Sequence, residues 1–97
     1  MFLILLTYIK PLEDIDHLVS EHRDFLERRY ASGHFLLSGR KDPRTGGVIL
    51  AKAKNRNEIE KILTEDPFFI EKMAEYEIIE FVPTMAAENL AYLKAVL

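Results

Sequence analysis

The sequence predicts an α+β fold in which one antiparallel sheet of four strands carries two helices on one face. Two observations predict it. The first is the order of the patterns along the chain: apolar runs typical of strands and segments with helical apolar spacing alternate as strand, helix, strand, strand, helix, strand. The second is that turn residues separate these segments. The chain has 97 residues, which is enough for one hydrophobic core but not for two, so a single domain spanning residues 1–97 is expected.

The first strand is expected at residues 2–9, where nearly every side chain is apolar. Such a run is typical of a strand that is covered on at least one face. After Pro11, apolar residues recur at helical spacing as far as Gly33, a stop signal, which predicts one long amphipathic helix. Its apolar residues are Leu12, Ile15, Leu18, Val19, Phe25, Leu26 and Tyr30.

The second and third strands are expected at residues 35–38 and 47–53, joined by a long connection, residues 39–46, that contains proline and glycine. A second helix follows, because Asn55 or Asn57 can cap it. Its apolar stripe is Ile59, Ile62 and Leu63, and it should end near Glu65.

The last strand is expected at residues 76–82, where Pro83 ends it. Residues 86–97 then predict a short C-terminal helix, because Leu90, Leu93 and Leu97 lie at helical spacing. Two positions are left open for this helix: it packs on its own subunit, or it reaches a partner subunit.

This order of elements is the split β-α-β pattern of ferredoxin-like domains. With both helices on one face, the other face of the sheet would remain bare, and an apolar bare face needs a cover. We therefore expect a homodimer in which the sheet faces of two copies meet.

Composition excludes several partners. Lysine and arginine number 13 against 16 aspartates and glutamates, a net charge of −3, so no basic field attracts nucleic acid. The absence of cysteine leaves no disulfide or thiolate nucleophile and fits the cytoplasm. The apolar start, residues 1–6, lacks a basic leader and is too short to span a membrane, so no membrane partner is expected.

Motifs for metals, cofactors and nucleophiles are missing from the sequence. His17 and His22 are five residues apart and would point in different directions, and there is neither a His-Glu-x-x-His set nor a phosphate-cradling glycine motif. Ser20 and Ser38 do not lie in a Gly-x-Ser-x-Gly turn. We therefore expect no cofactor, no metal and no serine nucleophile.

Of the three histidines, His22 is the one predicted to face inward. It shares a helix face with Val19, Phe25 and Leu26. Two interpretations stay open, a core histidine bonded to backbone and a functional acid or base. His17 lies on the charged face and needs no role, and the role of His34 is undetermined.

Asp66 precedes Pro67 and Phe68, an order in which the carboxylate caps a helical turn and proline takes its first position. Taken alone, this capping role is the favoured interpretation. His22, Gly33, the pair Ser38-Gly39 and the run Asp66-Pro67-Phe68 together resemble the YCII-related family over nearly the whole chain. Residues 43–51 resemble one branch of it.

The resemblance implies a dimeric α+β barrel with a pocket in each subunit, in which His22 and Asp66 form an acid-base pair. A carboxylate bonded to one imidazole nitrogen would fix the tautomer and leave the other nitrogen to move a proton. This predicts cofactor-independent chemistry on a small molecule, of the lyase, isomerase or dehydrohalogenase type.

The same resemblance implies a set of substrate-binding residues. Phe68 and Phe69 would supply an apolar wall and Ser38, with Gly39, a polar edge. Arg40 or Arg44 would bind an anionic or phenolic group. The favoured alternative for both arginines is that they are solvated loop residues. Arg40 stands where many relatives have proline, which leaves the shape of the pocket open.

Two other classes of function remain. One is a non-catalytic domain of the same fold that binds a small molecule or a protein. The other is a different lineage with the same barrel, such as monooxygenases acting on aromatic substrates or lactone isomerases, and the Asp66-Pro67-Phe68 and Ser38-Gly39 pairing argues against it.

Overall fold

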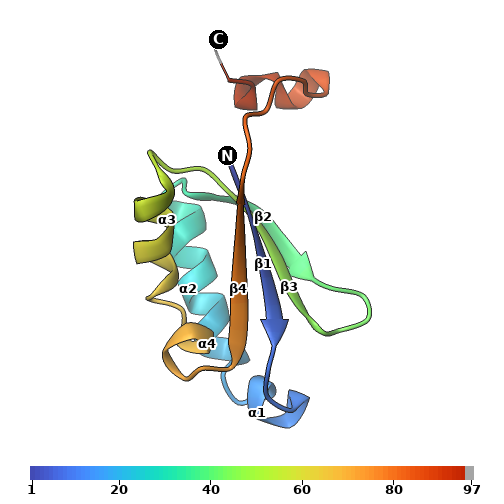
Figure 1. Cartoon of the computed structure of the whole chain (residues 1–97), viewed down its shortest axis with the longest axis vertical. Helices are drawn as coiled ribbons and strands as arrows, with labels where there is room; N and C mark the ends of the chain where they lie inside the picture. The colour runs from blue at the N-terminus through green and yellow to red at the C-terminus, as the bar shows by residue number, and fades with distance from the viewer. Residues whose placement is uncertain (96–97) are drawn as a thin grey trace.

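Four strands form one sheet in the computed structural model, which describes residues 1–95 (Figure 1). They are β1 (Phe2–Tyr8), β2 (Phe35–Arg40), β3 (Gly46–Ala51) and β4 (Ala74–Glu80). Their order across the sheet is β2-β3-β1-β4, and each neighbouring pair is antiparallel. This is the ferredoxin-like topology, so the predicted fold class is confirmed.

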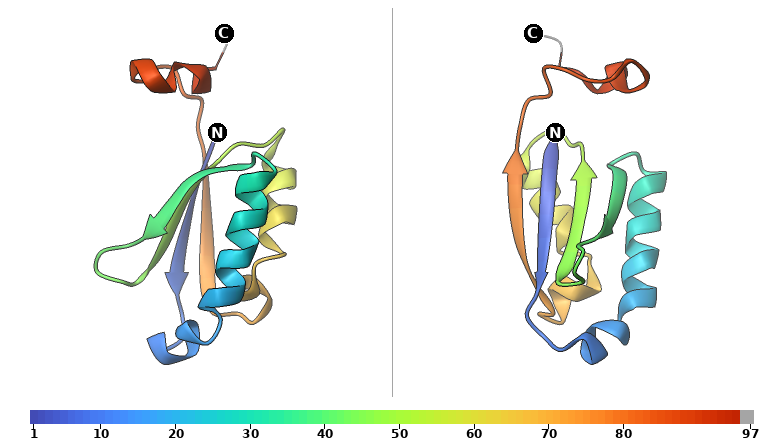
Figure 2. Two further views of the ribbon diagram at one scale, coloured as in Figure 1. Left: turned by 180° about the vertical axis from the view of Figure 1, so that it is seen from behind. Right: turned by 90° about the vertical axis from the view of Figure 1, so that its right-hand side faces the viewer.

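Helices α2, α3 and α4 lie on one face of this sheet, and α1 lies beyond the end at which β1 finishes (Figures 1 and 2). They are α1 (Leu12–Asp16), α2 (Val19–Ala31), α3 (Arg56–Leu63) and α4 (Pro67–Ile70). Phe2, Ile4 and Leu6 of β1 are buried on the helix side, because side chains alternate between the faces of a strand. Phe25 of α2 and Ile59 of α3 are fully buried in the same core.

The long first helix of the prediction is interrupted, so that prediction was wrong in its extent. Leu18 has φ −111° and ψ 1°, outside the helical region, and separates α1 from α2. Its N–H bonds to the carbonyl of Ile15, and the regular α-helical pattern resumes where the N–H of His22 bonds to Leu18. Neither glycine nor proline marks this break, so the sequence pattern did not indicate it.

The β2–β3 hairpin is tighter than predicted. Gly39 and Arg40 belong to β2, and Gly46 already belongs to β3, so residues 41–45 alone connect the strands. β3 ends at Ala51, two residues before the predicted end. An irregularity shifts the register between Phe35 and Leu37, which is the signature of a β-bulge.

The second half of the chain follows its local signals closely. Asn55 is the N-cap of α3, and its side-chain oxygen accepts a hydrogen bond from the N–H of Glu58 at 2.9 Å. Asn57, the other predicted cap, lies inside the helix. The helix ends at Leu63. β4 begins at Ala74 and ends at Glu80, each two residues earlier than expected.

The face of the sheet opposite the helices carries an apolar row. Leu37, Leu50, Leu3 and Ile79 are successive register partners across β2, β3, β1 and β4. Leu37 and Ile79 are exposed. No helix of the described chain lies over this face (Figure 2).

The C-terminal segment extends away from the sheet, beyond the end at which β4 finishes (Figures 1 and 2). It contains a short helix of the 3-10 type, η1 (Glu88–Leu93), inside the range 86–97 in which a short C-terminal helix was predicted. Leu90 and Leu93 belong to η1, and Leu97 lies outside the described residues. Met85 and Tyr92 are 88% and 72% exposed.

Within residues 1–95, none of the helices combines the length and apolar character needed to cross a bilayer.

Candidate active site

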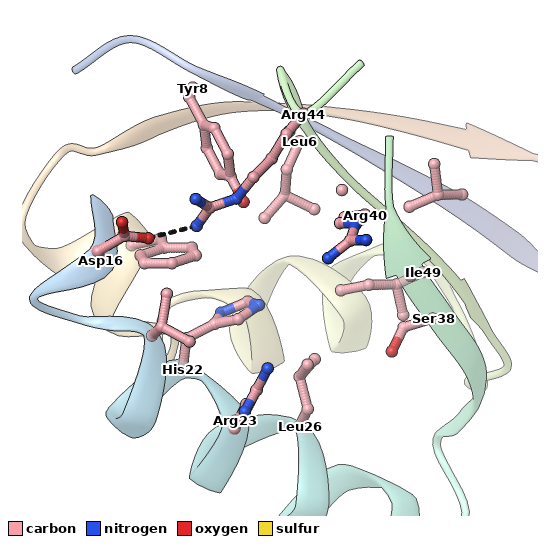
Figure 3. A pocket seen from close by; sticks show the side chains of 16 residues that line it. Leu6, Tyr8, Asp16, His22, Arg23, Leu26, Ser38, Arg40, Arg44 and Ile49 are labelled. Atoms are coloured by element: carbon pink, nitrogen blue, oxygen red, sulfur yellow. Dashed lines mark hydrogen bonds and ion pairs between the residues drawn. The ribbon is translucent and has the colours of Figure 1, made fainter. Parts of the chain in front are cut away.

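An open cleft of about 730 Å³ lies between α2 and the β2–β3 hairpin (Figure 3). Its floor and walls are mainly apolar, and polar side chains reach it from both sides. The residues that line it include Leu6, Val19, His22, Arg23, Leu26, Ser38, Gly39, Arg40, Arg44, Ile49 and Phe68. A cleft of this size and mixture suits a small molecule.

His22 and Asp66, 44 residues apart in the chain, are in contact at this cleft. Nδ1 of His22 lies 2.8 Å from Oδ1 of Asp66. The Asp66 side chain is completely buried, whereas the His22 side chain keeps 16% of its surface exposed. The buried carboxylate therefore lies behind an imidazole that borders the cleft.

Local structure places both side chains. His22 stands one turn into α2, directly after the break at Leu18, on the face that also carries Val19 and Leu26. Asp66 is the N-cap of α4, with Pro67 at the first helical position, and its Oδ1 accepts a hydrogen bond from the N–H of Phe68 at 3.0 Å. The predicted capping role of Asp66 is thus present together with the contact to His22.

Tyr76 completes the environment of the carboxylate. Its hydroxyl donates a hydrogen bond to Oδ2 of Asp66 at 2.6 Å. Burial raises the pKa of Tyr76 well above its ordinary value, and the neighbouring Asp66 carboxylate acts in the same direction. The phenol therefore stays protonated and remains a donor. Sequence reasoning missed this residue, although a half-buried tyrosine in a strand requires a hydrogen-bond partner.

These contacts assign the proton on the His22 ring. Asp66 accepts from Phe68 N–H on Oδ1 and from Tyr76 on Oδ2, so it acts as an ionised acceptor. Nδ1 of His22 must then carry the hydrogen that faces it. Nε2 of a neutral ring is left as an acceptor, and no side chain of the described chain bonds to it.

Aromatic contacts fix the plane of the imidazole. Phe68 stacks on His22 with ring centroids 4.2 Å apart and an angle of 15° between the planes. Tyr8 meets the edge of Phe68 at 5.9 Å. Because the ring is held by a hydrogen bond at one edge and by stacking on one face, His22 presents a defined nitrogen to the cleft.

The predicted substrate-binding residues line the cleft except for Phe69, which is exposed and packs its ring against Tyr76 instead. Those that line it differ in their partners. Ser38 is hydrogen-bonded to the hydroxyl of Tyr30. Arg44 forms an ion pair with Asp16 at 2.5 Å (Figure 3). The Arg44 hydrogen bond holds the pKa of Asp16 below its usual range and raises the pKa of Arg44. Arg40 has no ion pair among the described residues.

The β-bulge explains why Ser38 and Arg40 reach the cleft. Ser38 pairs with Ile49 and Arg40 with Gly47, and both partners lie on the helix-facing side of β3. Phe35 faces the same side. Without the extra residue, strand alternation would have turned Ser38 and Arg40 to the opposite face.

Arg23 is a further cleft residue that the sequence did not indicate. It follows His22 on α2 and lines the cleft. It was not among the predicted site residues. No pattern of residue types distinguishes it from the other arginines of this helix.

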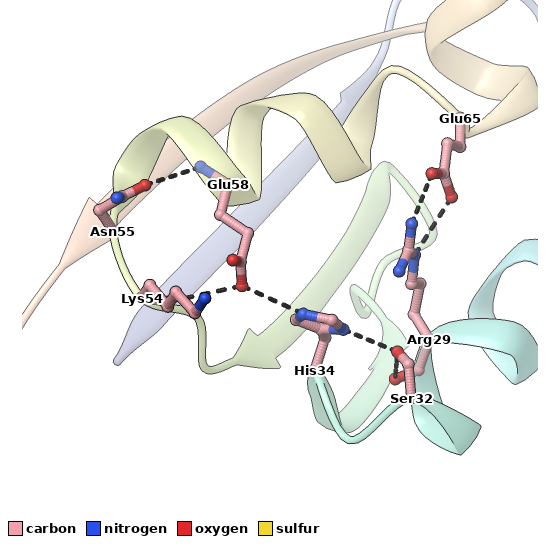
Figure 4. A network of polar contacts seen from close by, with 7 residues as sticks. All are labelled: Arg29, Ser32, His34, Lys54, Asn55, Glu58 and Glu65. Atoms are coloured by element: carbon pink, nitrogen blue, oxygen red, sulfur yellow. Dashed lines mark hydrogen bonds and ion pairs between the residues drawn. The ribbon is translucent and has the colours of Figure 1, made fainter.

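The other histidines lie outside the cleft. His17 is exposed at the break between α1 and α2. His34 bonds through Nδ1 to Ser32 at 2.7 Å and through Nε2 to Glu58 at 3.1 Å, which joins the start of β2 to α3 (Figure 4). Both nitrogens of His34 are therefore engaged in a structural network.

No group of three or more potential metal ligands occurs in residues 1–95.

A second polar contact connects α2 to the region of Asp66. Arg29 on α2 bonds through Nε to one oxygen of Glu65 at 3.1 Å and through a terminal nitrogen to the other at 2.5 Å (Figure 4). Glu65 directly precedes Asp66. This two-point contact helps to hold the helix that carries His22 against the turn that carries Asp66.

Comparison with known proteins agrees with the ferredoxin-like α+β class. The model of the YCII-related domain matches residues 1–82, so the chain belongs to the YCII-related family. The structure is similar to that of 5-chloro-2-hydroxyhydroquinone dehydrochlorinase (TftG) from Burkholderia phenoliruptrix AC1100, solved in complex with 2,5-dihydroxybenzoquinone. The TM-score is 0.70 at 17% identity, covering 86% of this chain and 95% of that chain. No curated protein matches this chain.

Proposed function

We propose that this protein is a small-molecule enzyme in which His22, oriented by Asp66, moves a proton without a cofactor. The observation that carries the proposal is the 2.8 Å contact between His22 Nδ1 and the fully buried carboxylate of Asp66, at the edge of a cleft. A positioned imidazole of this kind is the commonest general base in enzymes.

In the proposed reaction, Nε2 of neutral His22 removes a proton from the substrate. Asp66 stabilises the resulting imidazolium without taking up the proton itself. In an isomerase, the imidazolium returns the proton to another atom of the substrate. In an elimination, the electron pair of the broken C–H bond forms a double bond, the leaving group departs with its own pair, and His22 later gives the proton to water.

The similar solved structure supports the elimination variant, because that protein is a dehydrochlorinase and holds a quinone ligand. Of the predicted lyase, isomerase and dehydrohalogenase reactions, the last is the one that this similar structure represents. A cleft with Phe68, Leu26 and Ile49 in its walls suits a flat ring.

We also propose that two copies associate through the sheet face opposite the helices. The apolar row Leu37, Leu50, Leu3 and Ile79 crosses all four strands on that face, and a second copy would bury it. The exposed Met85 and Tyr92 favour a C-terminal segment that contacts the partner. Sedimentation of the wild type and of Leu37→Lys tests this, since the variant should shift toward monomer.

The catalytic proposal is tested by proton exchange. Wild type, His22→Ala and His17→Ala are incubated in D₂O with 5-chloro-2-hydroxyhydroquinone and with small ketones and enols, and carbon-bound deuterium and released chloride are measured. We expect His22→Ala to lose activity roughly 10²–10⁴-fold and His17→Ala, the exposed control, to keep it. Equal activity of all three proteins would contradict the proposal.

A non-catalytic binding domain is the second candidate, and one observation favours it. Both oxygens of Asp66 have partners, Phe68 N–H and Tyr76, that would serve the fold even without chemistry. For this candidate, small-molecule binding occurs without proton exchange or chloride release, and the main effect of Asp66→Ala is lost stability.

A further inference from the structure

Two arginines, Arg23 and Arg40, line opposite walls of the cleft. Arg23 belongs to α2 and directly follows His22, whereas Arg40 is the last residue of β2. Figure 3 shows both side chains reaching the space beside the His22 ring. In the part of the chain that the structure describes, neither guanidinium forms a hydrogen bond or ion pair.

Arg23 has a carboxylate at ion-pair spacing on its own helix. Glu27 lies one helical turn after Arg23, where i,i+4 ion pairs form, yet the two are not paired. Arg44, the third arginine of the cleft, is engaged with Asp16. The cleft therefore presents two unpaired cations although the chain as a whole has a net charge of −3.

The backbone keeps this space open beside Arg40. The β-bulge turns Arg40 to the helix side, where its register partner is Gly47. Gly47 has no side chain to fill the space, and an added Cβ would come within 3.2 Å of the Gly39 carbonyl oxygen. A larger residue at position 47 would crowd both the hairpin and the cleft.

We infer that the cleft binds a small planar carboxylic acid, whose carboxylate is held between Arg23 and Arg40. Guanidinium groups match carboxylates in geometry and bind them through two parallel hydrogen bonds. The apolar part of the ligand lies against Leu26 and Ile49, which places it in front of Nε2 of His22. This inference rests on the proposed function and names its substrate class.

A phosphate is the less suitable anion. Phosphate sites usually use backbone N–H groups of a glycine-rich turn at a helix start. The glycines at this cleft, Gly39, Gly46 and Gly47, are paired within the sheet instead. At this cleft the positive charges come from the side chains of Arg23 and Arg40, which stand on two opposite walls. This arrangement suits a planar carboxylate, which has one oxygen for each arginine.

The test uses benzoate as the probe, with benzamide as its neutral counterpart of the same shape and 4-nitrophenolate as a phenolic anion. Binding to the wild type, Arg23→Gln, Arg40→Gln and Arg28→Gln is measured by calorimetry. Arg28 is an exposed arginine of the same helix that does not line the cleft. We expect benzoate to bind the wild type and Arg28→Gln equally, and each cleft variant about tenfold more weakly.

Three results would overturn the inference: no saturable benzoate binding to the wild type, equal binding of benzoate and benzamide, or unchanged benzoate affinity in both Arg23→Gln and Arg40→Gln. Stronger binding of 4-nitrophenolate than of benzoate would replace the carboxylate with a phenolate. His22→Ala separates this inference from the catalytic proposal, because it should keep benzoate binding even though proton exchange is lost. Thermal unfolding of each variant verifies that it is folded.

Discussion

Tyr76 donates its hydroxyl hydrogen bond to Oδ2 of Asp66 at 2.6 Å, while Oδ1 of the same carboxylate faces His22 and the N–H of Phe68. Every oxygen of this fully buried group is therefore occupied, and three elements, α2, α4 and β4, meet at it. Removing one hydrogen-bond donor from a buried carboxylate lowers the free energy of unfolding. Tyr76 can be replaced without moving the backbone, so its contribution can be measured directly.

We predict that Tyr76→Phe lowers the free energy of unfolding by about 1–3 kcal/mol, because it leaves Oδ2 of Asp66 without its donor. Urea unfolding of wild type and variant measures this difference. Tyr92→Phe is the matched control, since Tyr92 is 72% exposed and should be neutral. A loss below about 0.5 kcal/mol, the range of ordinary surface changes, would mean that water replaces the hydroxyl.

The raised pKa of Tyr76 also predicts a pH dependence at the alkaline end. The folded protein keeps this phenol neutral, whereas the unfolded chain ionises it near pH 10. The contribution of Tyr76 to the free energy of unfolding should therefore be constant below about pH 10 and fall above it, by roughly 1.4 kcal/mol per pH unit for one such group. Urea midpoints between pH 8 and 11.5 should decline less steeply in Tyr76→Phe, and identical slopes would refute the assignment.

Gly46→Ala should destabilise the sheet. A Cβ at Gly46 would lie 1.8 Å from the carbonyl oxygen of Leu6, a backbone atom that cannot move without disturbing β1. We expect a loss of about 1–3 kcal/mol or more, as for other overpacked sites. Gly39→Ala, where nothing lies within 4 Å, is the control and should change thermal stability little. Equal melting temperatures for the two variants would show that β1 and β3 can separate at no cost.

Asn55→Ala should lower the free energy of unfolding by about 1 kcal/mol, because the Asn55 side chain caps α3 by accepting a hydrogen bond from the N–H of Glu58. Asn57→Ala serves as the comparison, since Asn57 lies within the helix and alanine is the better helix former. Chemical unfolding of both variants distinguishes the two asparagines, which the sequence pattern left equivalent. A larger loss for Asn57→Ala would reverse the assignment.

Local patterns predicted the order of elements well, because alternating burial in β1 and the stripe Ile59, Ile62 and Leu63 in α3 follow directly from the periods of strand and helix. The break at Leu18 was not predictable in this way. Neither glycine nor proline stands at this position, and Leu18 itself fits the apolar spacing of a continuous helix.

The candidate site was predictable only in part. Helical spacing turned His22 inward and Asp66-Pro67 indicated a cap, but their proximity came from family resemblance, since it spans 44 residues. Tyr76 depends on the register of β4, and Arg40 on a bulge that reverses strand alternation. Both are tertiary effects that residue patterns do not carry. The catalytic and binding roles of these residues stay predictions.

Oδ1 of Asp66 is shared by the imidazole of His22 and by the first turn of α4. If the first turn of α4 opens, Asp66 moves and the hydrogen bond to His22 is lost with it. The opening of the turn and the loss of ring orientation therefore share one free energy of opening. Hydrogen exchange at the Phe68 amide therefore reports on the orientation of the His22 ring. A ligand that locks the histidine should slow the exchange of this single backbone proton, which provides a readout that needs no turnover.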